Sequence, residues 1–354
     1  MTMKPEYIVG GIVLVLLVLG VGFLAVSPGS GTSGVLKLGA KPYQEIVNPS
    51  GFVNTEPFML KELVGKKVIL VDFMTYSCIN CQRTFPYLNA WYETYKDRGL
   101  EIVGIHTPEF AFERDIGNVR EAMERFGIKH RIVLDNDYAT WRAYGNQYWP
   151  RKYLVDIHGN IVYDHIGEGA YEETEMKIRE LLEERERVLG MGMPELTEGL
   201  ATESVSAETS VARSPETYFG SLRNEYLANG TSGRDGVQTF ALPATLVRNA
   251  LYLAGSWNIA PEYAESVSEA SIVYRYNAKE VYIVAEADTP VEITVLQDGK
   301  AVGASGGVDV SVEGIVKIGE SRLYKLVKNG VPGEHLLELK VSGPGARFYA
   351  FTFG

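Results

Sequence analysis

A pair of cysteines three positions apart, directly after an apolar run, constrains this chain more than any other feature. Residues 67–73 (KVILVDF) are nearly all apolar, which is typical of a strand that is covered on both faces of a sheet. Cys78 and Cys81 follow this strand and open a helical stretch that ends near Asp97. Because a helix N-terminus presents free N–H groups and a positive dipole, it favours the thiolate form of the first cysteine. The pattern predicts a redox pair in which Cys78 attacks and the more shielded Cys81 resolves.

The same Cys-x-x-Cys spacing also occurs as one half of a zinc site. The chain holds no further cysteine in its 354 residues, and its five histidines include no pair at His-x-x-x-His spacing. A structural zinc site needs four ligands, so the composition favours redox chemistry over metal binding. We therefore expect no metal, and no cofactor other than a redox-active disulfide between Cys78 and Cys81.

The charge balance excludes one class of partner. The chain has 34 Lys and Arg against 45 Asp and Glu, a net charge of −11, and no run rich in Lys or Arg. Binding to nucleic acid needs a basic face that releases phosphate counterions, so no nucleic-acid partner is expected. The length exceeds that of an ordinary single domain and favours two domains with accessory segments.

The first segment carries a membrane signal. Residues 7–26 contain no charge over twenty positions, a length that spans ~30 Å as a helix, the thickness of a bilayer core. This run is longer than the ~7–15 residues of a signal-peptide core. We expect residues 1–27 to be a single transmembrane anchor and 28–36 a tether, with the soluble domains on the extracytoplasmic side of the cell membrane. A cleaved signal peptide is the alternative.

Residues 37–190 alternate strand and helix signals, which predicts an α/β domain around a central sheet. Besides the strand before the cysteines, the strands expected are Leu100–His106, Arg131–Leu134 and a hairpin of Arg151–Asp156 with Asn160–His165. The helices expected are Arg83–Asp97, Asn118–Phe126, Tyr138–Tyr144 and Glu172–Val188.

The composition changes after this domain. Residues 191–213 are rich in Ser, Thr, Glu and Ala and contain no aromatic residue, so we expect a flexible linker. Residues 214–354 read as an all-β sandwich of short strands separated by turns. The strands expected are Ser271–Tyr276, Glu280–Ala285, Val291–Leu296, Val308–Val316, Leu323–Val327, His335–Val341 and Ala346–Phe353.

Three further positions match the thioredoxin pattern: Asp72 before the cysteines, Pro86 inside the following helix, and Pro150 before the strand KYLVDI. The resemblance implies that Asp72 lies beneath the resolving cysteine and accepts its proton. It also implies that Pro150 is the cis-proline facing the disulfide, with Trp149 and Tyr76 as the other substrate-binding candidates. His106, Glu109 and Glu113 follow the neighbouring strand, which makes them candidates for side chains close to the thiols.

The resemblance extends to a particular family. MTYSCINCQRTFPYL, LDNDYATWRAYGNQYWPRKYLVD and HIGEGAYEETE look like the thioredoxin portion of DipZ-type proteins. SPETYFGSLRNEY and FYAFTFG resemble that family's C-terminal β-sandwich, which is likened to a carbohydrate-binding module. The 72 residues from Cys78 to Pro150 resemble the insertion-bearing TlpA/ResA-like branch of the thioredoxin fold. Two departures stand out: one helix replaces the multi-helix electron-transfer domain of DipZ proteins, and Met74 stands at a position usually held by Trp.

This resemblance implies a thiol–disulfide oxidoreductase that acts on disulfide-containing proteins. An acid at Asp72 and the TlpA/ResA likeness favour a reductase that a membrane electron donor of the CcdA or DsbD type supplies. The Ile79-Asn80 pair between the cysteines is typical of neither reducing nor oxidising enzymes, so the direction stays open.

Two rival functions remain. The first is a glycan- or cell-envelope-binding β-sandwich protein with an accessory redox domain, since its aromatic residues are of the kind that stack on sugar rings: Trp257, Tyr252, Tyr274, Tyr276 and Tyr282. Alternating aromatics are more often core residues. The second is a peroxiredoxin with the pattern P-x-x-x-T-x-x-C, which Thr75 and Cys78 satisfy but Val71 does not.

Overall fold

The strand that precedes the cysteine pair lies in the middle of a seven-stranded sheet. The computed structural model describes residues 41–192, 199–206 and 212–354. In the first of these ranges the strand order is β1-β7-β6-β3-β4-β5-β2. β3 pairs in parallel with β4 and antiparallel with β6, so the sheet is mixed. The strands are β1 (Lys41–Pro42), β2 (Gly51–Val53), β3 (Val68–Met74), β4 (Leu100–His106), β5 (Arg131–Leu134), β6 (Arg151–Val155) and β7 (Asn160–Ile166).

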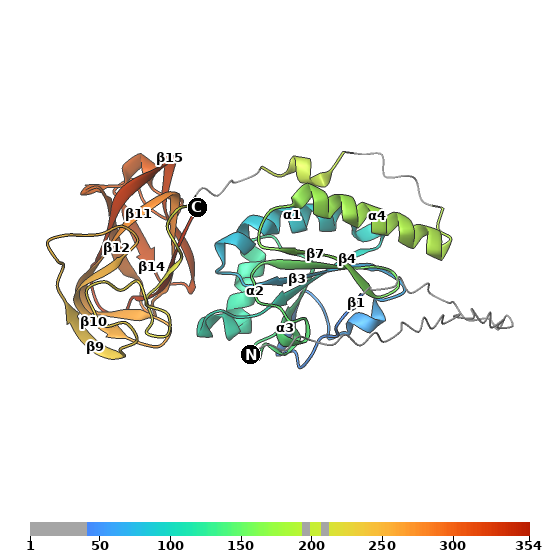
Figure 1. Ribbon diagram of the computed structural model, residues 1–354, viewed down its shortest axis with the longest axis horizontal. Helices are drawn as coiled ribbons and strands as arrows, with labels where there is room; N and C mark the ends of the chain where they lie inside the picture. Colours follow the sequence, from blue (N-terminus) through green and yellow to red (C-terminus); the bar gives the residue numbers. More distant parts are fainter. Residues whose placement is uncertain (1–40, 193–198, 207–211) are drawn as a thin grey trace, which may run out of the picture. The chain divides into compact units, whose positions relative to one another are not determined.

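Helices cover both faces of this sheet, which explains the continuous apolar run of β3. The helices are α1 (Ile79–Tyr95), α2 (Ile116–Arg125), α3 (Ala139–Ala143) and α4 (Tyr171–Leu189). Figure 1 shows α1 and α4 on one face and α3 on the other. Successive β3 side chains alternate between the faces. Leu70 and Met74 join a buried cluster with α1, whereas Val71 and Phe73 join the cluster on the α3 side. The predicted thioredoxin-like α/β fold is confirmed.

The C-terminal region is β-rich, as predicted, but its strands are longer and more continuous than the sequence indicated. Nine strands form one hydrogen-bonded sheet. The expected strands Ser271–Tyr276 and Glu280–Ala285 are parts of β11, and Leu323–Val327 and His335–Val341 are parts of β15. The strands are β8 (Thr217–Tyr218), β9 (Gly236–Phe240), β10 (Leu251–Ile259), β11 (Ala264–Glu286), β12 (Val291–Gln297), β13 (Lys300–Ala301), β14 (Ile315–Ile318), β15 (Arg322–Val341) and β16 (Arg347–Phe353).

These differences have a physical reason. β11 pairs with β15 along most of its length, with register shifts between Ala278 and Glu280 that let the strand bend without ending. Pairing with a neighbour therefore carries both strands through the Gly and Asn positions that look like turns in the sequence. The expected strand Val308–Val316 is wrong except at its end, because only residues from Ile315 onward pair with β12. β8, β9, β10 and β13 lie outside the strands expected from the sequence.

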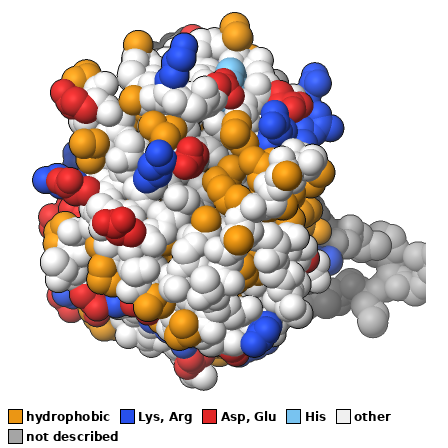
Figure 2. Space-filling view, turned by 90° about the vertical axis from the view of Figure 1, so that its left-hand side faces the viewer, with side chains coloured by type: hydrophobic (Ala, Val, Ile, Leu, Met, Phe, Trp, Pro, Cys, Tyr) orange, Lys and Arg blue, Asp and Glu red, His pale blue; other side chains and the backbone are white. Residues whose placement is uncertain are grey.

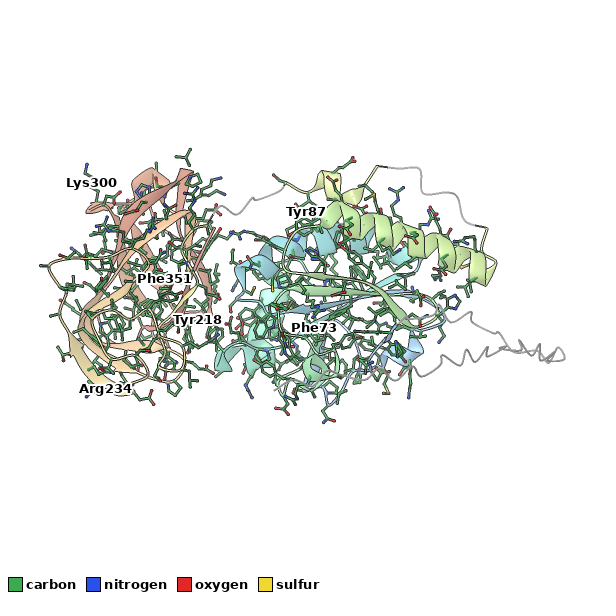
Figure 3. The ribbon with its side chains drawn as sticks, in the orientation of Figure 1. Phe73, Tyr87, Tyr218, Arg234, Lys300 and Phe351 are labelled. Carbon is green, nitrogen blue, oxygen red and sulfur yellow. The ribbon has the colours of Figure 1, made fainter. Side chains whose placement is uncertain are left out.

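The C-terminal sheet encloses its own apolar core. The buried cluster includes Trp257, Tyr274, Tyr276 and Phe351. Figure 3 shows Phe351 among the strands of this region and Phe73 within the other sheet. Each of the two β-sheets is thus packed around a separate set of buried side chains.

Part of the expected linker, 199–206, is ordered against the α/β domain. Its 3₁₀ turn η4 (Ala201–Ser204) lies against α1 and α4. Glu175 of α4 accepts hydrogen bonds from the backbone N–H groups of Ala201 and Thr202 at 2.6 and 2.7 Å. The indole of Trp91 donates to the Thr202 hydroxyl at 3.0 Å. A buried carboxylate that caps free N–H groups explains why this polar segment is held in place.

The expected membrane anchor, residues 1–27, and the tether, residues 28–36, lie outside the described residues. Among the residues that are described, no helix has the length and apolar character needed to cross a bilayer.

Candidate active site

The two cysteines occupy different environments at the start of α1. Cys78 is the N-cap residue, half-buried, and its Sγ accepts a hydrogen bond from the backbone N–H of Cys81 at 3.4 Å. Cys81 lies one turn further along and is fully buried. Both are free cysteines. Burial raises the pKa of the Cys81 thiol, and the neighbouring Cys78 and Asp72 raise it further. Cys78 is therefore the accessible sulfur, and Cys81 needs a group that removes its proton.

Asp72, which the thioredoxin resemblance implies to lie beneath this pair, is on β3 and close enough to Cys81 to raise the pKa of its thiol. Its side chain is completely buried, and it shares a face of β3 with Leu70 and Met74, which pack in the same cluster as Cys81. Neither carboxyl oxygen has a hydrogen-bond partner among the described residues. Burial raises the pKa of Asp72 to about 7, against the opposing charge of Lys152. An acid of this kind exchanges its proton near neutral pH.

Sequence reasoning missed Lys152, which lies on β6 opposite Asp72 and is also completely buried. Burial lowers the pKa of Lys152, whereas Asp72, Cys81 and Glu168 raise it. The signal was present in the sequence, because a lysine interrupts the apolar strand just after Pro150 and shares the face of Leu154.

Glu113 organises the loop that carries Cys78. One carboxyl oxygen accepts hydrogen bonds from the Thr75 hydroxyl at 2.5 Å and from the Ser77 hydroxyl at 2.6 Å. The other accepts from the backbone N–H groups of Glu109 and Phe110 at 2.6 and 3.0 Å. Glu113 thereby joins the segment before the cysteines to the segment after β4. Glu113 thus binds Ser77, the residue before Cys78, and it also engages the hydroxyl of Thr75, which belongs to the peroxiredoxin-like pattern.

His106 is close to the same segment but is not placed to act as an acid. It is completely buried, its ring stacks on Tyr76 with centroids 5.6 Å apart, and burial lowers its pKa to about 3. The imidazole is therefore neutral at physiological pH and serves as a packing element.

Of the three substrate-binding candidates, two lie together and one does not. The peptide bond between Trp149 and Pro150 is cis, and the Trp149 indole donates to the backbone oxygen of Thr107 at 3.1 Å. Trp149 is half-buried and packs against the cluster that includes Cys81. Tyr76 is only 2% exposed, and its hydroxyl donates to the backbone oxygen of Ser321 in the C-terminal domain at 3.1 Å. Tyr76 therefore contacts the second domain and presents no surface to a substrate.

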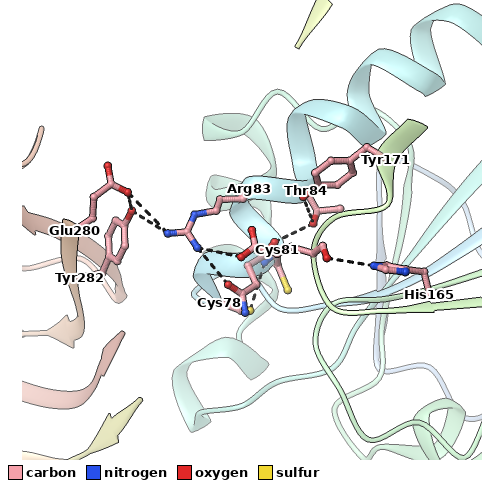
Figure 4. Close-up of polar contacts among 10 residues, drawn as sticks. Cys78, Cys81, Arg83, Thr84, His165, Tyr171, Glu280 and Tyr282 are labelled. Atoms are coloured by element: carbon pink, nitrogen blue, oxygen red, sulfur yellow. Dashed lines mark hydrogen bonds and ion pairs between the residues drawn. The ribbon is translucent and has the colours of Figure 1, made fainter. Parts of the chain in front are cut away.

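The C-terminal domain contacts the helix that carries the cysteines, within the compact unit formed by residues 38–354. Arg83 of α1 lies 3.3 Å from Glu168 and donates to the Tyr282 hydroxyl at 3.2 Å, and Glu280 lies 3.9 Å away (Figure 4). Ile79, between the two cysteines, belongs to a buried apolar cluster with Tyr282 and other residues of the β-rich region. One side of the cysteine pair is thus covered by the second domain.

The aromatic residues of the C-terminal domain are core residues. Trp257, Tyr274 and Tyr276 are fully buried, and Tyr252 and Tyr282 are at most 4% exposed. The face of this domain in Figure 2 shows acidic and basic side chains dispersed among hydrophobic and uncharged ones. None of the five aromatics proposed for sugar stacking is available to a ligand.

The fold and the thiol pair define a thioredoxin-fold redox protein, and comparison with known proteins agrees. The Redoxin family matches residues 42–182, and the family described as "Thioredoxin like C-terminal domain" matches residues 214–354. Protein DipZ of Mycobacterium tuberculosis is 37% identical over 309 residues, which cover 86% of this chain and 42% of DipZ. The thiol-disulfide oxidoreductase ResA of Halalkalibacterium halodurans is 33% identical over 130 residues, which cover 36% of this chain and 67% of ResA.

A solved thioredoxin-like protein in its oxidized form aligns at a TM-score of 0.38 with 27% identity, over 41% of this chain and 97% of that one. The chain belongs to the thioredoxin family of thiol-disulfide oxidoreductases. It is related to DipZ in both its α/β and its β-rich regions, although it spans less than half the length of that relative.

Proposed function

We propose that this protein is a membrane-anchored, extracytoplasmic oxidoreductase that reduces disulfides of other proteins through Cys78 and Cys81. The observation that carries the proposal is the placement of the half-buried Cys78 at the N-cap of α1, with Cys81 buried one turn behind it and close to Asp72. This arrangement separates an attacking sulfur from a resolving sulfur and supplies the second with a proton acceptor.

The reaction follows from these positions. The Cys78 thiolate attacks a substrate disulfide, so that a mixed disulfide forms and one substrate sulfur leaves as a thiolate. Cys81 then gives its proton to the Asp72 carboxylate and attacks the Cys78 sulfur. The second substrate sulfur leaves, and a Cys78–Cys81 disulfide remains. No cofactor beyond this disulfide takes part, and two electrons have passed from the cysteine pair to the substrate.

A second reductant must return these electrons. We assign this task to a membrane donor of the CcdA or DsbD type, because the chain is related to DipZ and carries an uncharged run at residues 7–26 that matches the thickness of a bilayer. Deleting residues 1–27 should release the protein from the membrane fraction while leaving exchange with dithiothreitol unchanged. Retention of the shortened protein in washed membranes would contradict the anchor.

Partner trapping is the direct test of the proposed function. The Cys81→Ser variant cannot resolve a mixed disulfide, so it should accumulate covalent, dithiothreitol-sensitive adducts with substrate proteins. The Cys78→Ser and Cys78→Ser/Cys81→Ser variants are the matched controls and should form none. The wild type should also reduce insulin with dithiothreitol as donor. If the wild type does not reduce insulin and Cys81→Ser forms no Cys78-dependent adducts, the proposed function is wrong.

A further inference from the structure

A cavity lies beside the helix that carries the cysteines and is lined by residues of both domains. Its volume is about 140 Å³, close to that of an engineered cavity of ~150 Å³ that holds one benzene molecule, so it has room for one small side-chain group. The exchange reaction at Cys78 and Cys81 does not itself use the side chains that line it. Among these are Gln82, Arg125, Phe126, Asp309, Arg322 and Lys325.

The charges that line this cavity do not cancel. Glu320 lies 2.7 Å from the guanidinium of Arg125 and 2.9 Å from that of Arg322. Asp309 lies 2.9 Å from Arg322, so two carboxylates serve these two arginines. Lys325 is a third cation, half-buried, and its ammonium has no hydrogen-bond or ion-pair partner among the described residues. One positive charge of the cavity is therefore left without an anion.

The surroundings of Lys325 are ordered before any ligand arrives. Its backbone N–H donates to the Asp309 carboxylate at 2.7 Å, and the same carboxylate pairs with Arg322. The Arg322 guanidinium in turn lies 3.8 Å from the centroid of the Tyr324 ring. Because these neighbours are already held in place, an anion that pairs with Lys325 does not have to order them.

The rest of the cavity wall is apolar. Phe126, Val308 and Leu323 contribute side chains to it. A wall of this kind suits the methylene groups of an Asp or Glu side chain, whose carboxylate then meets the ammonium. It offers little to a ligand that carries polar groups on every side, because those groups would lose water without gaining partners.

Gln82 places the cavity close to the attacking sulfur. This residue lies four positions after Cys78 on α1, which is about one turn or ~6 Å along the helix axis. Its side chain donates at 2.9 Å to the backbone oxygen of Tyr76, two positions before Cys78. An extended substrate chain advances ~3.3 Å per residue. A side chain about two to four residues from the substrate cysteine can therefore reach the cavity while Cys78 attacks that cysteine.

We propose that this cavity binds the carboxylate of an Asp or Glu residue near the disulfide of the protein substrate, and that Lys325 thereby determines which disulfides Cys78 attacks efficiently. This specificity deepens the proposed function and rests on it. The carboxylate pairs with the Lys325 ammonium, and no covalent bond forms or breaks in the cavity. Since the chain carries a net charge of −11, a local cation without an anion marks the place where an acidic segment is accepted.

Paired disulfide peptides test the site in the full chain. Each peptide carries Glu or Gln at one position, and this position is moved stepwise along both sides of the cysteine. At the favoured position, kcat/KM of the wild type should be about three- to fivefold higher for the Glu peptide, mainly through KM, which is the upper range for a partly exposed ion pair. Higher ionic strength should reduce the preference. Lys325→Met should abolish it, whereas Lys317→Met, on β14 and outside the cavity, should retain it.

Charge reversal distinguishes a lost contact from a damaged fold. Lys325→Arg should keep the preference for Glu, and Lys325→Glu should instead prefer a peptide with Lys at the same position. A reversed preference cannot arise from a general loss of structure. The inference is wrong if the wild type shows no preference at any position, or if Lys325→Met keeps the preference of the wild type.

Chemical protection of Lys325 gives a readout that does not need exchange activity. A Glu peptide without cysteines should slow acetylation of Lys325 by an N-hydroxysuccinimide ester, as measured by mass spectrometry, whereas the matching Gln peptide should not. Acetylation of Lys317 is the internal control and should be the same with both peptides. Equal acetylation of Lys325 with either peptide would contradict a carboxylate site. If the wild type lacks exchange activity, the proposed function fails, whereas this protection still decides whether the cavity binds a carboxylate.

Discussion

Arg83, two residues after Cys81, donates a hydrogen bond at 3.2 Å to the hydroxyl of Tyr282 in the C-terminal domain. Arg83 is 7% exposed and also lies within ion-pair distance of Glu168 and Glu280. The α1 helix is therefore tied to the β-rich domain by a buried charge network beside the cysteines. The C-terminal domain is consequently expected to stabilise the redox site as well as to shape access to it.

Removing the Arg83 charge should destabilise the protein. Arg83→Met removes the buried cation that Glu168 and Glu280 share, although Glu280 keeps Lys328 at 3.4 Å. Breaking a buried pair costs up to ~3–5 kcal/mol. Arg125→Met is the matched control, because Arg125 pairs across the same two domains with the exposed Glu320, a contact worth ~0–1 kcal/mol. Urea unfolding of the full chain measures both. Equal losses in the two variants would show that the Arg83 network adds nothing beyond a surface contact.

Segment 199–206, which packs against α1 and α4, should increase the stability of the isolated α/β domain. A fragment of residues 37–190 leaves the Trp91 N–H and the Glu175 carboxylate without Thr202, whereas a fragment of residues 37–206 keeps these bonds. In the shorter fragment Glu175 keeps the Trp91 N–H and the Tyr95 hydroxyl as donors but loses the backbone N–H groups of Ala201 and Thr202. Because hydrogen bonds to a charged group contribute ~1.5–3 kcal/mol each, the longer fragment should be more stable by at least that amount. Thermal unfolding of both fragments checks this. Identical midpoints would mean that the contact is dispensable.

Mild proteolysis of the full chain gives a second view of this segment. We expect cleavage within 191–213 to spare residues 199–206, because their backbone is held against α1 and α4. Mass spectrometry of the fragments identifies the sites. Early cleavage inside 201–204 would show that the turn opens readily.

The two cysteines should differ in reactivity. Cys78 is half-buried at a helix N-terminus, whereas Cys81 is fully buried and its pKa is raised. In reduced protein near pH 7, iodoacetamide should therefore modify Cys78 at least about tenfold faster, since the thiolate is the nucleophile. Peptide mapping over a time course measures both rates. Comparable rates at the two positions would contradict the assignment of attacking and resolving sulfurs.

Replacing Asp72 should change stability in a pH-dependent way. The unfolded chain releases the Asp72 proton near pH 3.8, whereas the folded protein retains it until about pH 7. Deprotonation therefore favours the unfolded state between these values, and the stabilising effect of Asp72→Asn should grow as the pH rises from 4 to 7. The gain should approach an order of 2–4 kcal/mol, since each pKa unit corresponds to ~1.4 kcal/mol and loss of the Lys152 partner offsets part of it.

Denaturant unfolding of wild type and Asp72→Asn across pH 4–8 measures whether the stability gain of the variant grows with pH. Asp137→Asn, at an exposed position, serves as the control. A stability difference that is constant with pH would show that Asp72 does not titrate in this range. In Asp72→Asn, release of the mixed disulfide should also slow, because the Asn side chain cannot accept the Cys81 proton.

Glu113 should be needed to hold the segment before Cys78. Glu113→Gln replaces one acceptor oxygen by an NH₂ group, so the donors that face this oxygen lose their carboxylate acceptor. Buried hydrogen bonds to a charged group contribute ~1.5–3 kcal/mol each, so a loss of at least ~2 kcal/mol in unfolding free energy is expected. Glu121→Gln, at an exposed position of α2, should change the unfolding free energy by less than ~0.5 kcal/mol. A Glu113→Gln variant as stable as wild type would show that the Glu113 hydrogen bonds do not stabilise the segment before Cys78.

Sequence patterns were most informative where neighbours along the chain decide the structure. The apolar run of residues 67–73 and the helix opening at Cys78 follow from local periodicity and capping, and both are observed. The thioredoxin resemblance implied that Asp72 lies beneath the pair, and its side chain is completely buried. The strands of the C-terminal region were less accessible, since β11 and β15 continue through turn-like residues only because each pairs with the other.

By itself the sequence determined an α/β region, a β-rich region after it, and a thiol pair at the start of a helix, and its resemblance to thioredoxins implied the acid beneath that pair. The patterns that indicate these elements involve residues close together in the chain, within about two helical turns or one strand. Only the tertiary structure decided that Lys152 lies opposite Asp72, that Tyr76 faces the second domain, and that Arg83 joins Tyr282. Such contacts depend on strand register and on the packing of residues far apart in the chain, which no local pattern encodes.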